Sequence, residues 1–373
     1  MTIDEYIQRF AEEPGFLDFG AFGPTGTTVR EEDAALRGIL EHARFGATDA
    51  LFAQEVRARR AVAELTGHRD DQVVFQPSTS QGLMHTAFGL TGGVLLSSAE
   101  FPSIPFAVER AREALGVLQP VYLEREHGHV TPGDIQEQLT SSVKAVAVSL
   151  VDFRTGYLAD LEGIRQVIGD RLLIVDATQG FGVVDAPYEL VDVLVAGGQK
   201  WPRAGWGTGF LALSDDALEH LTPVWSGFSA TDHPGLPMDA VPPPSRSAAA
   251  FQVNHPDPLA QGRFAAALEE IAEVGVPEIR DRIARHVSRI IDLADEYAIP
   301  VSSPRAEHER AGLVVLEPAE DHLTTLSASL HNHGVAVTVR GGTVRVAPHA
   351  STTEETLAML KSAFLSFATV SAV

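Results

Sequence analysis

The sequence predicts an α/β protein with a mostly parallel central sheet covered by helices on both faces, followed by a smaller α+β domain. Short, continuously apolar segments alternate with amphipathic segments, which is typical of parallel strands connected by helices. With 373 residues the chain is long for a single core. Residues 226–258 are rich in Pro, Ser, Gly and Asp and indicate a connection between domains. We expect an N-terminal arm (1–15), a large domain (16–250) and a small domain (251–373).

The individual elements follow from periodicity and from their end signals. Helical spacing of apolar residues predicts helices over 30–44, 51–66, 103–115, 160–168, 259–274 and 277–297, and a last helix from about 352. Apolar runs predict strands over 72–75, 94–98, 145–150, 172–176, 191–195, 208–213 and 312–316. Gly67 is a helix stop signal, and Ser351 with Glu354 has the spacing of a capping box. Ligands in such a sheet bind at the carboxyl ends of the strands.

A hairpin is predicted near the C-terminus. Segments 335–340 and 343–346 flank Gly341-Gly342, a two-residue turn signal. With a two-residue turn, Arg340 pairs with Thr343 and Thr338 pairs with Arg345. Both arginines then project from one side of the hairpin.

Charge and composition limit the possible partners. The formal net charge of −22 argues against nucleic acid and anionic membrane surfaces. No apolar run approaches the roughly 20 residues of a membrane span, and no signal peptide is visible, so we expect a cytoplasmic protein. The chain has no Cys and therefore no thiolate ligand or Cys nucleophile. His127-x-His129 and His331-Asn332-His333 lack a third ligand, so we expect no metal site.

Lys200 is the most informative residue, because it is one of only three lysines against 25 arginines. A lysine amine can lose its proton and form a Schiff base with an aldehyde, whereas a guanidinium stays protonated. Lys200 follows Gly197-Gly198, and Asp176 ends the apolar run 172–176 just upstream. A carboxylate that keeps a pyridine nitrogen protonated and a Schiff-base lysine are what pyridoxal 5′-phosphate (PLP) needs.

Two further segments fit the same cofactor. Ser78-Thr79-Ser80 lies between a strand and a helix, where hydroxyls and backbone N–H groups bind phosphate. Phe101 follows the strand 94–98 and is well placed to stack on the pyridine ring.

Together these residues resemble the class V aminotransferase family of fold-type I PLP enzymes, which includes cysteine desulfurases, kynureninases and isopenicillin-N-epimerase-like proteins. The resemblance runs from Phe16–Pro24 through Asp176-Ala177-Thr178-Gln179, Gly197–Lys200 and Gly207-Thr208-Gly209 to Thr343–His349.

The resemblance implies a role for each matching residue. Lys200 would form the Schiff base and move the Cα proton, Asp176 would pair with the pyridine nitrogen, and Gln179 would hydrogen-bond the ring oxygen. Ser78, Thr79, Ser80 and Gln199 would surround the phosphate, and Phe101 would stack on the ring. Arg345 matches the arginine that binds the substrate carboxylate. The family implies a homodimer, in which His255 of the segment 251–256 would reach the partner's phosphate.

Departures from the family pattern shape the expected reaction. Because cysteine desulfurases receive sulfur on a Cys and this chain has none, we expect it not to be a cysteine desulfurase. We expect an aminotransferase acting on a small amino acid or amine, with a kynureninase-like hydrolase or a C–S lyase as alternatives. A PLP-fold regulator without turnover is a remote alternative. Arg340, Arg154 or Arg203 would bind a second acidic group on the substrate.

Overall fold

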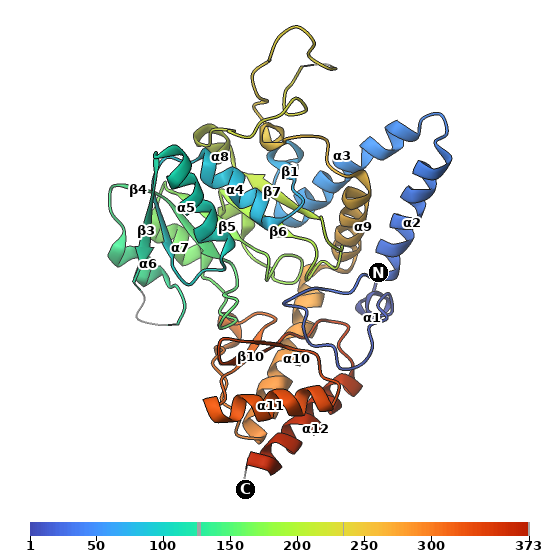
Figure 1. Cartoon of the computed structure of the whole chain (residues 1–373), viewed down its shortest axis with the longest axis vertical. Helices are drawn as coiled ribbons and strands as arrows, with labels where there is room; N and C mark the ends of the chain where they lie inside the picture. The colour runs from blue at the N-terminus through green and yellow to red at the C-terminus, as the bar shows by residue number, and fades with distance from the viewer. Residues whose placement is uncertain (125–127, 234, 372–373) are drawn as a thin grey trace.

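The structure is a computed structural model that describes residues 1–124, 128–233 and 235–371 (Figure 1). Its helices are α1 (Ile3–Ile7), α2 (Thr27–His42), α3 (Ala47–Thr66), α4 (Thr79–Gly89), α5 (Ser103–Leu115), α6 (Pro132–Gln138), α7 (Leu161–Ile168), α8 (Asp215–His220), α9 (Pro258–Val274), α10 (Val276–Glu296), α11 (Glu320–Asn332) and α12 (Glu354–Ser371). Its strands are β1 (Val73–Phe75), β2 (Gly92–Ser97), β3 (Leu118–Leu123), β4 (Val143–Ser149), β5 (Leu172–Asp176), β6 (Val193–Gly197), β7 (Gly209–Leu213), β8 (Val314–Leu316), β9 (Thr338–Arg340) and β10 (Thr343–Val346).

The large sheet has the order β1-β7-β6-β5-β4-β2-β3. Only β7 runs against its neighbours, pairing antiparallel with β1 and β6, whereas the remaining pairs are parallel. The carboxyl ends of β1, β2, β4, β5 and β6 therefore meet at one edge of the sheet. The predicted fold class, a mostly parallel sheet with helices on both faces, is confirmed.

The strands alternate between two buried faces. Val74, Leu96 and Ile174 pack with residues of α4, α5 and α8, whereas Phe75 and Val175 pack with residues of α3, α7 and α9. The sheet is thus buried on both sides, which explains why its strands are continuously apolar rather than alternating with polar residues.

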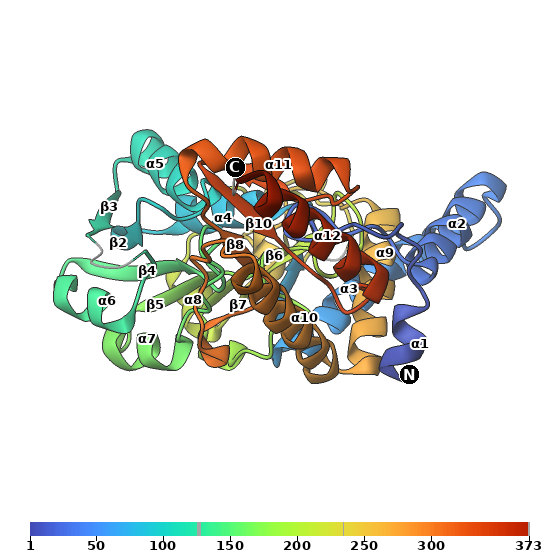
Figure 2. The same cartoon turned by 90° about the horizontal axis from the view of Figure 1, so that it is seen from below.

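The C-terminal part lies below the large sheet in Figure 1 and faces the viewer in Figure 2. Its antiparallel sheet has the order β8-β10-β9, with α11 packed against α12. The predicted hairpin register is confirmed, because Thr343 pairs with Arg340 and Arg345 with Thr338. Gly341 and Gly342 have φ of 58° and 82°, the left-handed values that a type I′ turn requires.

Some predicted local features differ from the structure. The backbone N–H of Thr356 donates to the Thr353 hydroxyl at the start of α12, so the Ser351 capping box is wrong. The Ser351 hydroxyl instead contacts Arg203 and Glu12, which tertiary packing brings to it. The sequence analysis also missed β3, an edge strand whose Pro120 obscures the pattern.

The division into domains stays a prediction. The helix α9, which the sequence analysis placed in the small domain, packs against α2 and α3 beside the large sheet. Tyr6 of α1 is buried, so the N-terminal arm is packed against the rest of the chain. Within the described residues, no helix is long and apolar enough to cross a membrane.

Candidate active site

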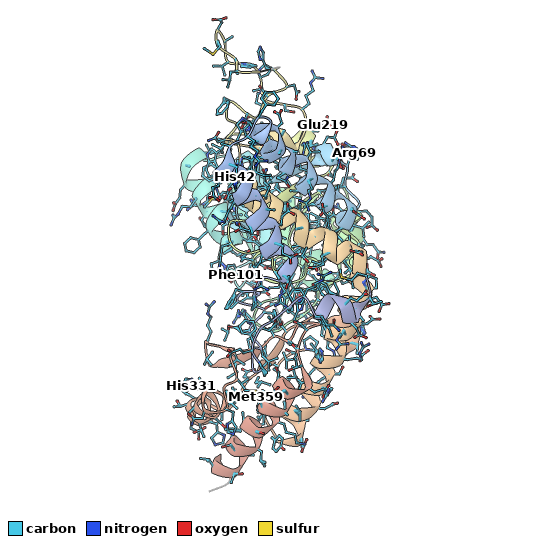
Figure 3. The ribbon with its side chains drawn as sticks, turned by 90° about the vertical axis from the view of Figure 1, so that its right-hand side faces the viewer. His42, Arg69, Phe101, Glu219, His331 and Met359 are labelled. Atoms are coloured by element: carbon cyan, nitrogen blue, oxygen red, sulfur yellow. The ribbon has the colours of Figure 1, made fainter. Side chains whose placement is uncertain are left out.

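A cavity of about 320 Å³ opens where the carboxyl ends of the parallel strands face the C-terminal hairpin. Figure 3 shows Phe101 close to this junction, with His331 and Met359 on the C-terminal part. The wall of the cavity includes every predicted site residue except Arg154, Arg203 and His255, namely Ser78, Thr79, Ser80, Phe101, Asp176, Gln179, Gln199, Lys200, Arg340 and Arg345. The fold thus gathers residues that lie as far apart in the chain as 78 and 345.

Lys200 follows β6 and points toward the aromatic wall of the cavity. Its Nζ lies 5.4 Å from the centroid of the Phe101 ring. Among the described residues, no carboxylate or hydrogen-bond acceptor contacts this amine. Burial lowers the pKa of Lys200 from 10.5 to about 8, with Arg345 and Arg340 lowering it further and Asp176 and Asp18 opposing the shift. The amine is therefore partly unprotonated near neutral pH, as a nucleophile or base must be.

The backbone around Lys200 is held by the N-terminal segment. The N–H of Gly23 donates to the carbonyl oxygen of Gln199 at 2.8 Å. A Cβ on Gly23 would lie only 2.1 Å from the carbonyl oxygen of Lys200, so this close approach requires glycine. The contact accounts for the glycine in the motif at residues 16–24.

Asp176 is the last residue of β5 and is buried. One of its carboxylate oxygens accepts a 2.9 Å hydrogen bond from the N–H of Thr178. Burial raises the pKa of Asp176, while the hydrogen bonds from Thr178 and the charge of Lys200 oppose the shift. A buried carboxylate needs a cationic partner to stabilise its negative charge, and a protonated pyridine nitrogen is such a partner.

The three hydroxyls after β1 lie at the start of α4. Ser78 caps the helix by accepting from the N–H of Gln81, while Thr79 and Ser80 occupy its first turn. The Thr79 hydroxyl contacts that of Thr178 at 2.7 Å, and the Ser80 hydroxyl contacts that of Ser103 at 2.8 Å. The side chain of Gln199 folds back over Gly197 toward Thr79, where a Cβ on Gly197 would meet both. Helix N–H groups and hydroxyls together suit a phosphate.

Arg345 lies on β10 at the opposite wall of the cavity. Its Nη2 donates to the Thr338 hydroxyl at 3.2 Å and lies 4.0 Å from a carboxylate oxygen of Asp18. Its buried Nε has no hydrogen-bond partner among the described residues. Burial lowers the pKa of Arg345, an effect that Asp18 partly offsets. Because its positive charge is only weakly balanced by neighbouring carboxylates, this guanidinium is suited to bind a carboxylate of the substrate.

The sequence analysis missed Glu100 and Asp18. Glu100 precedes Phe101, and its Oε2 accepts from the Ser149 hydroxyl at 2.5 Å and from the Ser149 N–H at 3.1 Å. Burial raises the pKa of Glu100 to about 7. Asp18 accepts a 2.6 Å hydrogen bond from Thr338 and orients the hairpin next to Arg345. In the sequence, the only indication of a role for Glu100 or Asp18 was that each lies beside a residue of a predicted motif.

Three arginines that were predicted to bind the substrate lie in different places. Arg340 is exposed and lines the cavity, whereas Arg154 lines a neighbouring cavity. The suggestion that Arg203 reads substrate is wrong, because Arg203 is buried and pairs with Glu12 at 2.5 Å. His255 lies outside this chain's cavity and stacks on Phe52, with ring centroids 5.3 Å apart.

No metal centre appears in the described part of the chain, where no three His, Asp or Glu side chains gather in a metal-binding group. His127 lies outside the described residues.

The arrangement fits PLP by its chemistry. Lys200 supplies a deprotonatable amine, Asp176 a buried carboxylate, Phe101 an aromatic face and the α4 N-terminus an anion site, all in one cavity. The unpaired Nε of Arg345 adds a group for a substrate carboxylate.

Known proteins resemble this chain in sequence and in fold. The aminotransferase class-V family profile matches residues 42–372. The chain is 24% identical over 314 residues to an uncharacterized aminotransferase, YcbU, of Bacillus subtilis, covering 80% of each chain. It is 26% identical over 301 residues to a probable cysteine desulfurase of Aeropyrum pernix, covering 75% of this chain and 72% of the relative. The structure of the cystine C–S lyase C-DES has a TM-score of 0.84 at 19% identity, covering 94% of this chain and 97% of C-DES.

The fold and the site define a PLP-dependent enzyme. The chain belongs to the class V aminotransferase family.

One sequence-based expectation is corrected. The exclusion of cysteine desulfurases is wrong as a statement of relationship, because curated relatives carry that name. A cysteine desulfurase of Thermococcus onnurineus also shares the fold, with a TM-score of 0.82, 21% identity and 93% coverage of both chains. The absence of Cys did not place this chain outside their group, because the fold and cofactor site do not depend on a thiol.

Proposed function

We propose that this enzyme removes the Cα proton of a small α-amino acid and expels a sulfur group from its Cβ. One observation supports the proposed removal of the Cα proton: Lys200, Asp176 and Arg345 line the same cavity, and Lys200 forms no ion pair among the described residues. Relatives named cysteine desulfurase and the C–S lyase C-DES support sulfur as the leaving atom. Elimination of this kind needs no thiol from the protein, which fits a chain without Cys.

Each residue has a defined part in this proposal. When bound, PLP withdraws electrons from the amino-acid Cα and so acidifies its proton. Arg345 binds the α-carboxylate and fixes the amino acid in the cavity. Lys200 would hold PLP covalently and, when an amino acid is bound, would accept the Cα proton at Nζ. Asp176 would keep a proton on the pyridine nitrogen, Gln179 would donate to the ring oxygen, and Thr79 with Ser80 would bind the phosphate.

The proposed reaction is an elimination followed by a hydrolysis. The Cα–H and Cβ–S bonds break, the proton passes to Lys200, and the sulfur leaves with the electron pair as a thiolate. Addition of water to the released three-carbon fragment then gives pyruvate and ammonia. With cystine as substrate, the sulfur product would be cysteine persulfide.

We also propose that the active enzyme is a homodimer. Phe52 and Phe228 are exposed aromatics that contact His255, and Trp206 is exposed at the cavity wall. Exposed aromatic groups of this kind support a covering partner, and His255 would then approach the partner's phosphate. Light scattering should give twice the chain mass. A cytoplasmic location stays a prediction.

The test begins with the cofactor. Protein loaded with PLP should show a visible absorption band, and borohydride should fix the label on Lys200. A Lys200→Ala variant should lose this label, whereas Lys144→Ala, on an exposed residue of β4, should keep it.

Product analysis then tests the reaction. Incubation with L-cystine or S-substituted cysteines should release pyruvate and ammonia in equal amounts. A keto acid that retains the substrate side chain, formed with pyridoxamine phosphate, would instead indicate transamination and contradict the proposed elimination.

A further inference from the structure

A second cavity of about 650 Å³ adjoins the cofactor cavity. The two share four wall residues: Phe153, Thr338, Arg340 and Arg345. An amino acid whose α-carboxylate binds Arg345 would therefore have its side chain directed along a wall common to both cavities. The second cavity is large enough to hold an extended side chain.

The charged groups in the second cavity are mostly cationic. Arg154 and Arg340 line it together with Arg345, and Glu317 is its single carboxylate among the described residues. His129 also lines it and stacks on Tyr157, with ring centroids 3.7 Å apart. Such a surplus of positive charge is unusual in a chain with a net charge of −22.

The guanidiniums of Arg154 and Arg340 also lack partners in the part of the chain that the structure describes. Within residues 1–124, 128–233 and 235–371, neither guanidinium forms an ion pair or a hydrogen bond, whereas arginines elsewhere, such as Arg57 and Arg263, lie against carboxylates. The charge of Arg340 reaches the active site, since it helps to lower the pKa of Lys200 and of Arg345. Two unpaired guanidiniums beside a substrate site suit a planar anion.

We infer that the preferred substrate carries a second carboxylate at the far end of its side chain, bound by Arg340 and Arg154. The inference rests on the proposed function, because it requires an amino acid anchored through Arg345. Arg340, placed at the turn end of β9 and common to both cavities, is the main specificity residue, and Arg154 lines the wall beyond it.

The test uses two substrates that differ only in the distal group. S-carboxymethyl-L-cysteine ends in a carboxylate, whereas S-carbamoylmethyl-L-cysteine ends in the neutral amide of nearly the same shape. For the PLP-loaded wild-type enzyme, kcat/KM for pyruvate formation should favour the carboxylate by about 10–100-fold, the range expected for a charged hydrogen bond. Because both arginines are exposed to solvent, this preference should shrink as salt is added.

Variants then assign the preference to residues. Arg340→Gln should reduce kcat/KM for the carboxylate by about 10–100-fold more than it reduces kcat/KM for the amide, because only the carboxylate loses a charged hydrogen bond. Arg154→Gln should act in the same direction. Arg285→Gln is the matched control, because Arg285 is also exposed and has no ion pair among the described residues but lies on α10, outside both cavities. It should keep the wild-type preference.

The possible results distinguish a failure of this inference from a failure of the proposed function. Equal kcat/KM for the two compounds in the wild type, or an equal loss for both in Arg340→Gln, would overturn the inference while pyruvate formation still supported the proposed function. If L-cystine yields pyruvate but neither compound does, the inference is overturned and the proposed function stands. If L-cystine and both compounds fail to yield pyruvate, the proposed function fails and the inference falls with it. Persisting turnover of the amide by Arg340→Gln shows that the variant is folded.

Discussion

The indole N–H of Trp201 donates a 2.9 Å hydrogen bond to the side-chain oxygen of Gln179. Because an indole nitrogen can only donate, this contact fixes which end of the Gln179 amide is oxygen. The amide nitrogen donates at 2.9 Å to the carbonyl oxygen of Gly20 and keeps a second N–H. Trp201 thereby positions Gln179 with one amide N–H that has no acceptor among the described residues, and this N–H would serve the predicted contact with the ring oxygen of PLP.

The first prediction tests this relationship. Trp201→Phe should free the Gln179 amide to rotate and weaken PLP binding by about 2–10-fold, the effect of one net hydrogen bond. A titration of the cofactor-free protein with PLP, followed by absorbance, measures the change. Trp225→Phe is the control, because Trp225 packs on Phe88 away from the cavity. Unchanged affinity in Trp201→Phe would show that Gln179 does not depend on the indole.

The second prediction concerns the protonation of Lys200. Since its pKa is lowered to about 8, the rate at which PLP attaches covalently should rise with pH through about 8. Asp176 raises this pKa and Arg345 lowers it. The profile should therefore move to lower pH in Asp176→Asn and to higher pH in Arg345→Gln. Stopped-flow absorbance over pH 6–10 would measure these shifts, and shifts in the reverse directions would contradict the assigned electrostatics.

The third prediction concerns the pair formed by Glu12 and Arg203. The Arg203 side chain is only 1% exposed and that of Glu12 12%. Glu12→Gln should leave a buried guanidinium without its charge partner and lower the free energy of unfolding by about 3–5 kcal/mol. Arg69→Gln, which breaks the exposed pair with Asp215, should lower the free energy of unfolding far less, because solvent screens an exposed ion pair. Urea unfolding compares them, and equal losses would refute the distinction.

The fourth prediction is a pH dependence that arises from Glu100. Burial raises its pKa from 4.5 to about 7, so the folded state favours the neutral acid. The folded protein then binds more protons than the unfolded chain between these values, and its stability falls as pH rises through this window. Relative to Glu100→Gln, the wild type should lose stability from pH 5 to pH 7 and change little above pH 8.

Urea unfolding at several pH values provides the measurement for Glu100. Glu109→Gln is the control, because hydrogen bonds from Tyr122 and Arg112 lower the pKa of Glu109. Its stability contribution is therefore lost only in acid and should be constant between pH 5 and pH 8. If the wild type gained stability over Glu100→Gln as pH rose, the carboxyl would be stabilised in its ionised form instead.

Local sequence patterns predicted most of the elements around the site. The run 172–176 became β5 with Asp176 at its end, and Gly341-Gly342 set the hairpin register that pairs Arg345 with Thr338. These features could be predicted because they depend on periods of two or 3.6 residues and on the special conformations of glycine. The scarcity of lysine singled out Lys200 without any knowledge of the fold.

Other features depend on contacts between distant segments and gave no local signal. Arg203 pairs with Glu12 and so cannot read substrate, although it lies close to Lys200 in the chain. Ser351 joins the same buried group instead of capping α12. The comparisons likewise corrected an argument from composition, since the lack of Cys did not exclude relatives named cysteine desulfurase.

The sequence by itself determined the alternation of strands and helices and the identity of the lysine, the carboxylate and the hydroxyls of the site, because each depends on side-chain chemistry and short-range periodicity. Only the tertiary structure decided that β7 runs antiparallel in the sheet, that Trp201 fixes Gln179, and that Arg154 and Arg340 line one cavity. Those outcomes are set by the packing of segments that are not adjacent in the chain, such as Gln179 and Trp201, 22 residues apart, or the still more distant Arg154 and Arg340. A local sequence pattern does not contain such contacts.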